Sequence, residues 1–140
     1  MRYFAVIDTN VIVSAMLKPD SVPGTILKFA LADIITPLVN DEILREYNNV
    51  VRREKFGFDE SDISFVLSNL VEKAIFLDRT KTNDAFVDQK DLVFYEITLT
   101  AKSKGTAFLI TGNIKHFPRE PFVVTPKEML DIIDEQKMLI

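Results

Sequence analysis

The segment Tyr3-Phe4-Ala5-Val6-Ile7-Asp8-Thr9-Asn10 is the most informative stretch of this chain. Its first five residues are apolar or aromatic, which favours a buried strand of a parallel sheet whose two faces are both covered. Ligands of open α/β sheets bind at the carboxyl ends of the strands, and Asp8 directly follows this strand. Asp8 is therefore a candidate for chemistry. The alternative is that it only caps a helix that starts near Asn10.

Composition places the chain among ordinary globular proteins. It has 140 residues, of which 47% are hydrophobic and 27% charged, and this predicts one domain over residues 1–140. The absence of cysteine excludes disulfides and thiolate metal sites and suits a reducing compartment. Because the chain has no apolar run of membrane-spanning length and no signal-like N-terminus, we expect a soluble, cytoplasmic protein without a membrane partner.

The net charge of −4 argues weakly against general electrostatic capture of nucleic acid. A local basic patch matters more than the total charge. Three stretches are candidates for such a patch: Arg52-Arg53-Glu54-Lys55, Lys102 with Lys104, and Lys115-His116.

Strand-like and helical patterns alternate along the chain. The alternation predicts βαβ units with right-handed crossovers, and hence a three-layer α/β/α sandwich around a mostly parallel sheet. The expected strands are 3–7, 34–36, 74–77, 107–110 and 122–124, and the expected helices are 10–16, 22–33, 40–53, 59 to about 71, 91–104 and 125 to about 135. Asn40 is the expected N-cap of the third helix, and Thr125 and Glu128 form a capping box for the last.

Carboxylates and amides gather where these elements begin or end, which suits a hard divalent cation such as Mg²⁺ with its preference for oxygen ligands. Glu42 and Glu46 share one helical face, but only Glu46 borders the apolar stripe and can reach an interior cleft. The alternative is that both are surface glutamates. Asp88 and Asp91 are further candidates, with the alternative that they only favour the positive end of a helix.

Glu96 lies inside an apolar arc of its helix, between Leu92, Val93 and Leu99. Burial of an unpaired carboxylate is costly, so Glu96 must bind a cation, form an ion pair or take up a proton. Metal binding, or support of a metal ligand, is one of the roles open to it.

Thr111, Gly112 and Asn113 end a later strand in a sharp turn, where Thr111 and Asn113 are candidates for a supporting role. His116 is the only histidine and could contact a phosphate or lie in a solvated loop. The chain lacks a phosphate-binding P-loop, a dinucleotide fingerprint and any Ser/His/Asp or Cys/His nucleophile system.

The ordered set of motifs resembles the PIN-domain nucleases. The motifs are Val6-Ile7-Asp8-Thr9-Asn10-Val11, Ile43-Leu44-Arg45-Glu46-Tyr47, Asp88-Gln89-Lys90-Asp91-Leu92-Val93-Phe94-Tyr95-Glu96 and Leu109-Ile110-Thr111-Gly112-Asn113-Ile114-Lys115-His116-Phe117. By this resemblance Asp8, Glu46 and Asp91 would bind the metal, assisted by Asp88 or Glu96. Thr9, Asn10 and Ser14 would order these ligands from behind. The family's fourth acid corresponds to the neutral Asn113, which favours one Mg²⁺ or Mn²⁺ ion over two.

Within that family the chain is most similar to the toxins of bacterial toxin–antitoxin operons. The resemblance implies a ribonuclease that hydrolyses RNA with a metal-activated water, an antitoxin protein partner and a homodimer. A PIN-like domain that has lost turnover and only binds RNA or protein is the main alternative. A phosphatase of the haloacid-dehalogenase type is disfavoured, because that class has a second Asp where this chain has Asn10.

Overall fold

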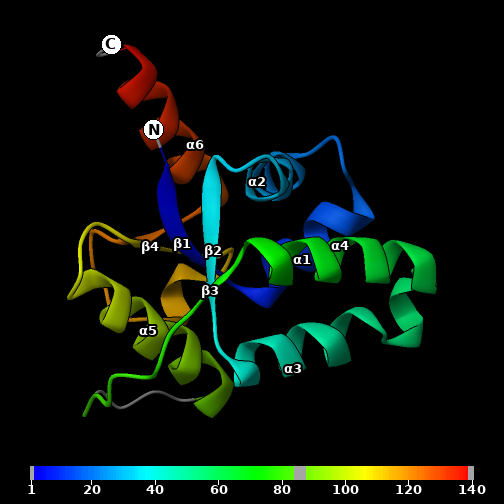
Figure 1. The fold of residues 1–140 in the computed structure, drawn as a ribbon, viewed down its shortest axis with the longest axis horizontal. Helices are drawn as coiled ribbons and strands as arrows, with labels where there is room; N and C mark the ends of the chain where they lie inside the picture. The colour runs from blue at the N-terminus through cyan, green and yellow to red at the C-terminus, as the bar shows by residue number, and fades with distance from the viewer. Residues whose placement is uncertain (1, 84–87, 139–140) are drawn as a thin grey trace.

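A five-stranded sheet forms the centre of the molecule in a computed structural model that describes residues 2–83 and 88–138. Its strands are β1 (Tyr3–Ile7), β2 (Ile35–Val39), β3 (Ile75–Phe76), β4 (Phe108–Ile110) and β5 (Val123–Val124). They lie in the order β3-β2-β1-β4-β5, and each neighbouring pair is parallel (Figure 1). β1 is therefore central, and its last three residues are almost completely buried, as its apolar sequence predicted.

Helices cover both faces of this sheet. They are α1 (Thr9–Leu17), α2 (Val22–Leu31), α3 (Asp41–Val51), α4 (Glu60–Lys73), α5 (Gln89–Lys102) and α6 (Pro126–Met138). α5 packs on β1, β2 and β4 from one side, whereas α2 and α4 contact β2 from the other (Figure 1). The predicted three-layer α/β/α sandwich is confirmed. None of the helices in the described residues is long and apolar enough to cross a membrane.

The second strand extends further than the sequence predicted, through Pro37 to Val39. Proline is disfavoured inside a strand because it lacks an N–H group. Here the Tyr3 amide donates to the Ile34 carbonyl, so in the parallel register the N–H groups of residues 36 and 38 face β1 and position 37 faces the opposite side. β3 pairs on that side only from Leu38 onwards. Pro37 therefore removes no hydrogen bond from the sheet.

Two of the predicted helix starts have the expected caps. The Asn40 side chain accepts a hydrogen bond from the Ile43 amide at 2.9 Å, which fixes the start of α3. Thr125 and Glu128 form both halves of the predicted capping box of α6. These caps set where the polar residues of each helix begin relative to the sheet.

The carboxyl ends of β1 and β4 meet at one edge of the sheet, because the two strands are parallel and adjacent. Asp8 follows β1 and Thr111 follows β4. The buried Tyr47 of α3 donates its hydroxyl to the Ile7 carbonyl at the end of β1. Its ring also lies 6.3 Å from that of Phe94 in α5, so α3 and α5 are both held against this edge.

Candidate active site

Asp8 is the most deeply buried acid at this edge, with only 7% of its surface exposed. The Thr111 hydroxyl donates a hydrogen bond of 2.7 Å to one oxygen of its carboxylate. Asp8 stands at the N-cap position of α1, yet its side chain makes no capping hydrogen bond there. The alternative in which Asp8 serves only as a cap therefore does not describe its carboxylate.

Glu46 is brought to the same edge by a hydrogen bond across the fold. The hydroxyl of the buried Thr9 donates to a carboxylate oxygen of Glu46 at 2.6 Å, which joins the first turn of α1 to α3. Glu42, one turn earlier on α3, is exposed and pairs with Arg79 instead. Glu46 is thus turned towards the interior and Glu42 towards solvent, as the apolar stripe of α3 predicted.

Asp91 lies in the first turn of α5 with 19% of its side chain exposed, and one of its oxygens is 3.4 Å from Nδ1 of His116. Asp88 has a different role, because its carboxylate accepts a hydrogen bond from the Lys90 amide at 2.8 Å and caps α5. Asp88 therefore caps α5, whereas Asp91 lies in the first turn, at the positive end of the helix, and also contacts His116.

The three acids Asp8, Glu46 and Asp91 act on one another electrostatically. Burial, followed by repulsion from Asp91 and Glu46, raises the pKa of Asp8 to about 6, although the hydrogen bond from Thr111 lowers it. The pKa of Asp91 is raised by burial and by the charges of Asp88 and Glu46, against a lowering effect of His116. Repulsion of this kind is what a bound cation would relieve.

The donor set fits a hard divalent cation by its chemistry, because all three side chains offer carboxylate oxygens. Across residues 2–83 and 88–138, however, no three His, Asp or Glu side chains are already arranged to hold a metal ion. Glu46 is held by Thr9, and Asp91 lies against His116. Each contact uses one oxygen of the carboxylate, so the other oxygen of each side chain is left for a cation.

Glu96 lies apart from this cluster, although its burial was predicted correctly. It forms an ion pair of 2.6 Å with Nε of Arg79 and accepts a hydrogen bond from the Thr82 amide at 3.0 Å. Of the roles that the sequence left open, the structure therefore shows ion pairing. Sequence reasoning did not identify Arg79, since a single arginine in a polar segment gives no signal of its partner.

The remaining predicted residues differ in how close they come to the acids. The Asn10 side chain accepts a hydrogen bond from the Gly112 amide at 3.4 Å and so links α1 to the turn after β4. Asn113 is exposed, and its amide donates to the Thr111 hydroxyl at 2.9 Å. Ser14 is exposed and makes no side-chain hydrogen bond to any acid among the described residues.

A family comparison matches most of the chain. Residues 5–115 match the PIN domain, and this range contains most of β1, all of β2 to β4 and all three coupled acids. The chain belongs to the PIN domain family. An uncharacterized protein of Methanocaldococcus jannaschii is similar to it, with 25% identity over 137 residues that cover 96% of this chain and 77% of the relative.

The PIN domain is a nuclease-type fold, so family membership supports a nuclease in general terms. The matched range includes Asp8, Glu46 and Asp91, which are coupled electrostatically.

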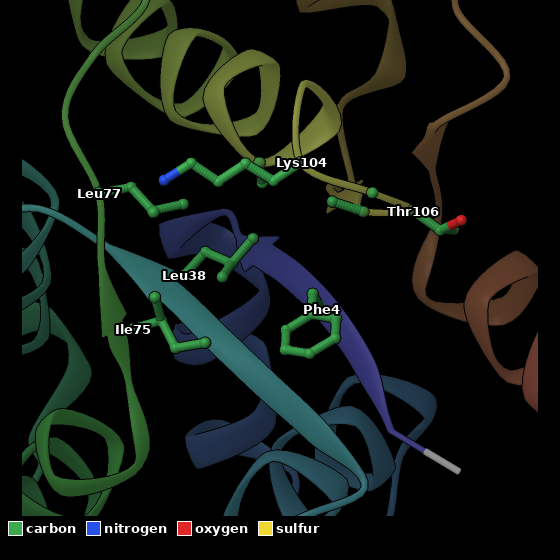
Figure 2. A pocket seen from close by; sticks show the side chains of 9 residues that line it. Phe4, Leu38, Ile75, Leu77, Lys104 and Thr106 are labelled. Carbon is green, nitrogen blue, oxygen red and sulfur yellow. The ribbon is translucent and has the colours of Figure 1, made fainter.

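A cavity with a mostly apolar lining lies apart from the three acids of the PIN domain. Figure 2 shows Phe4, Leu38, Ile75 and Leu77 around a cavity of about 210 Å³, with Lys104 beside it. Phe4 precedes Asp8 by four residues along β1, which corresponds to about 13 Å. None of its lining residues is an acid, so this cavity is not the site of a metal-dependent reaction.

Proposed function

We propose that this PIN domain is a divalent-cation-dependent ribonuclease, with Asp8, Glu46 and Asp91 as the residues that hold the cation. The observation that supports this most directly is the buried carboxylate of Asp8, whose pKa of about 6 reflects burial and repulsion from the other two acids. An acid this deeply buried among like charges is costly for the fold, which favours a functional reason for its presence.

A bound Mg²⁺ or Mn²⁺ ion would supply charge neutralisation at a phosphodiester and would ease deprotonation of the attacking water. The chain's own residues would orient the acids. Thr111 fixes one oxygen of Asp8, and Thr9 fixes one oxygen of Glu46. His116, 3.4 Å from Asp91, lies at the cluster and could contact a phosphate after Asp91 turns towards the cation.

The finer parts of the proposal come from the resemblance to toxins. We propose that the protein is the toxin of a toxin–antitoxin pair, that an antitoxin protein covers the acidic edge, and that the toxin forms a homodimer in the cytoplasm. Induced expression would then arrest growth, and co-expression of the antitoxin would restore it.

The central test is cleavage of a fluorogenic RNA. We expect cleavage by the wild-type chain with Mn²⁺ or Mg²⁺, none with EDTA, and a loss of at least about 100-fold in Asp8→Asn, because loss of this carboxylate weakens binding of the cation that would neutralise charge in the transition state. Ser14→Ala is the matched control: Ser14 is near Asp8 in the sequence, but it is exposed and its side chain makes no hydrogen bond to an acid among the described residues. We expect it to cleave at the wild-type rate.

One alternative function has an observation in its favour. The neutral Asn113 and the absence of three ready-made metal ligands in the described residues suit a PIN-like module that binds without turnover. Cation binding with no cleavage of any RNA would favour this module over the ribonuclease. Turnover of p-nitrophenyl phosphate without cleavage of RNA would favour a phosphatase.

A further inference from the structure

A groove lies between α3 and the start of α5, directly beside the acidic cluster. It has a volume of about 380 Å³, and its lining includes Arg45, Glu46, Asn49, Arg53, Gln89 and Lys90. Glu46 belongs to both the groove and the acidic cluster. A molecule that lies in the groove would therefore run into the candidate active site.

The groove carries three basic side chains. Arg45, Arg53 and Lys90 are exposed, and none forms an ion pair within the part of the chain that the structure describes. By contrast, the neighbouring Arg52 pairs with Glu60 at 2.6 Å, and Arg79 pairs with Glu42 and Glu96. The three groove cations thus present uncompensated positive charge.

The acids on the groove wall compensate this charge only in part. Glu42 already binds Arg79 through both of its oxygens, at 2.9 and 3.1 Å. Glu46 stands at the end that meets Asp8 and Asp91. A chain with a net charge of −4 therefore concentrates three unpaired cations beside its candidate active site.

The groove also has the shape of a strand-binding surface. Arg45 and Asn49 are one turn apart on α3, about 6 Å along the helix axis, and Arg53 continues the same line just beyond the helix end. Lys90 and Gln89 contribute from the opposite wall. Val50 of α3 and the largely buried Val93 of α5 complete the lining.

We propose that this groove binds the sugar–phosphate backbone of a single nucleic-acid strand and leads one phosphodiester to the acidic cluster. The proposal deepens the ribonuclease function and rests on it for the nature of the strand. None of the described residues that line the groove is aromatic, so stacking of bases on aromatic rings is not part of this proposal. Phosphate contacts then supply the affinity, and binding is strongly dependent on salt and weakly dependent on sequence.

The test measures binding without cleavage. Fluorescence anisotropy of a labelled single-stranded RNA is recorded with the full chain in EDTA over a series of salt concentrations. For the triple variant Arg45→Gln, Arg53→Gln, Lys90→Gln we expect the slope of log K against log salt to become shallower by about 2, since each lost phosphate contact removes about 0.7. The matched control Arg2→Gln, Lys18→Gln, Arg119→Gln removes the same charge outside the groove and should retain the wild-type slope.

The outcomes separate this proposal from the proposed function. Equal losses in the two triple variants, or no loss in either, would overturn the groove. Failure of the wild-type chain to bind RNA would also overturn the groove proposal and would favour a protein partner.

The groove variant should lose affinity for a DNA strand of the same sequence to a similar extent, because the groove contacts phosphates. A loss of affinity confined to RNA contradicts the proposal. With Mn²⁺ we expect the groove variant to raise KM with little change in kcat. If the wild-type chain binds RNA through the groove but cleaves no RNA, the groove proposal holds and the ribonuclease function is rejected.

Discussion

Among single residues, Asp8 has an environment far from that of an ordinary surface carboxylate. It is buried, it faces two other acids, and its pKa rises to about 6. At neutral pH the folded chain therefore holds a charge that it would be more stable without. A structural role alone gives no reason to retain an acid here, since a neutral side chain could accept the hydrogen bond from Thr111.

Substitution of Asp8 should separate stability from activity. We expect Asp8→Asn to raise the free energy of unfolding of the metal-free protein at neutral pH by about 1–3 kcal/mol, because a buried charge is removed and the pKa change sets the scale. Chemical denaturation in EDTA measures this effect, and the RNA assay should show that cleavage is lost.

A matched control is Asp59→Asn. Asp59 is exposed and precedes α4 without a side-chain capping bond, so we expect little change in stability or cleavage. A destabilised Asp8→Asn variant would show that the carboxylate contributes to the fold rather than to a function.

At the scale of elements, Arg79 joins the two helices that supply Glu46 and Asp91. Its Nε donates to Glu96 of α5 at 2.6 Å, and its Nη1 donates to Glu42 of α3. Glu42 lies one turn from Glu46 on the same helix, and Glu96 lies just over one turn from Asp91. The ion-pair bridge thus fixes the helices, and through them the separation of two of the three acids.

Loss of this bridge should affect both stability and cation affinity. We expect Arg79→Met to destabilise the fold by about 2–4 kcal/mol, because among the described residues Glu96 would keep the Thr82 amide as its one side-chain partner while it stays buried. Isothermal titration with Mn²⁺ should show an affinity about 10-fold weaker, since α3 and α5 are then less firmly held.

The control for this change is Arg52→Met, which removes an ion pair with the exposed Glu60. Both partners are well solvated, so we expect a much smaller effect on stability and none on Mn²⁺ affinity. If Arg79→Met lowers stability but leaves Mn²⁺ affinity unchanged, the bridge does not position the acids.

The elements were predictable from the sequence to the extent that local patterns determine them. Apolar runs predicted the strands, and capping residues predicted where α3 and α6 begin. The end of β2 was missed because Pro37 is tolerated only through its place in the sheet. Proline's effect on a strand depends on which neighbour it faces, and one sequence does not contain that information.

The candidate site was predictable as a set of residues but not as a set of contacts. The hydrogen bonds from Thr9 to Glu46 and from Thr111 to Asp8 join segments far apart in the chain. The burial of Glu96 followed from its helical face, whereas its partner Arg79 did not. The two arginines of the basic stretch at Arg52 and Arg53 also have different surroundings in the structure: Arg52 pairs with Glu60, whereas Arg53 lines the groove.

For the whole molecule, a divalent cation and a proton compete for the Asp8 carboxylate at this edge of the sheet. The raised pKa means that the folded chain binds the Asp8 proton more tightly than the unfolded chain does. This group therefore favours the folded state at acid pH, and its contribution disappears as the pH rises through about 6. A divalent cation has the opposite dependence, since it needs the carboxylates ionised.

The stabilisation by Mn²⁺ should accordingly grow with pH. At a free concentration near 100 times its dissociation constant, Mn²⁺ should stabilise the folded chain by about 2.7 kcal/mol at neutral pH. Near pH 5 the gain should fall to about half of this, because protonation of Asp8 weakens binding about 10-fold. Thermal denaturation of the wild-type chain with and without Mn²⁺ at both pH values measures the difference, and Asp8→Asn should show almost no gain at either. An equal gain at the two pH values, or a gain that Asp8→Asn retains, would place Mn²⁺ away from Asp8 and remove the main support for a cation at this site.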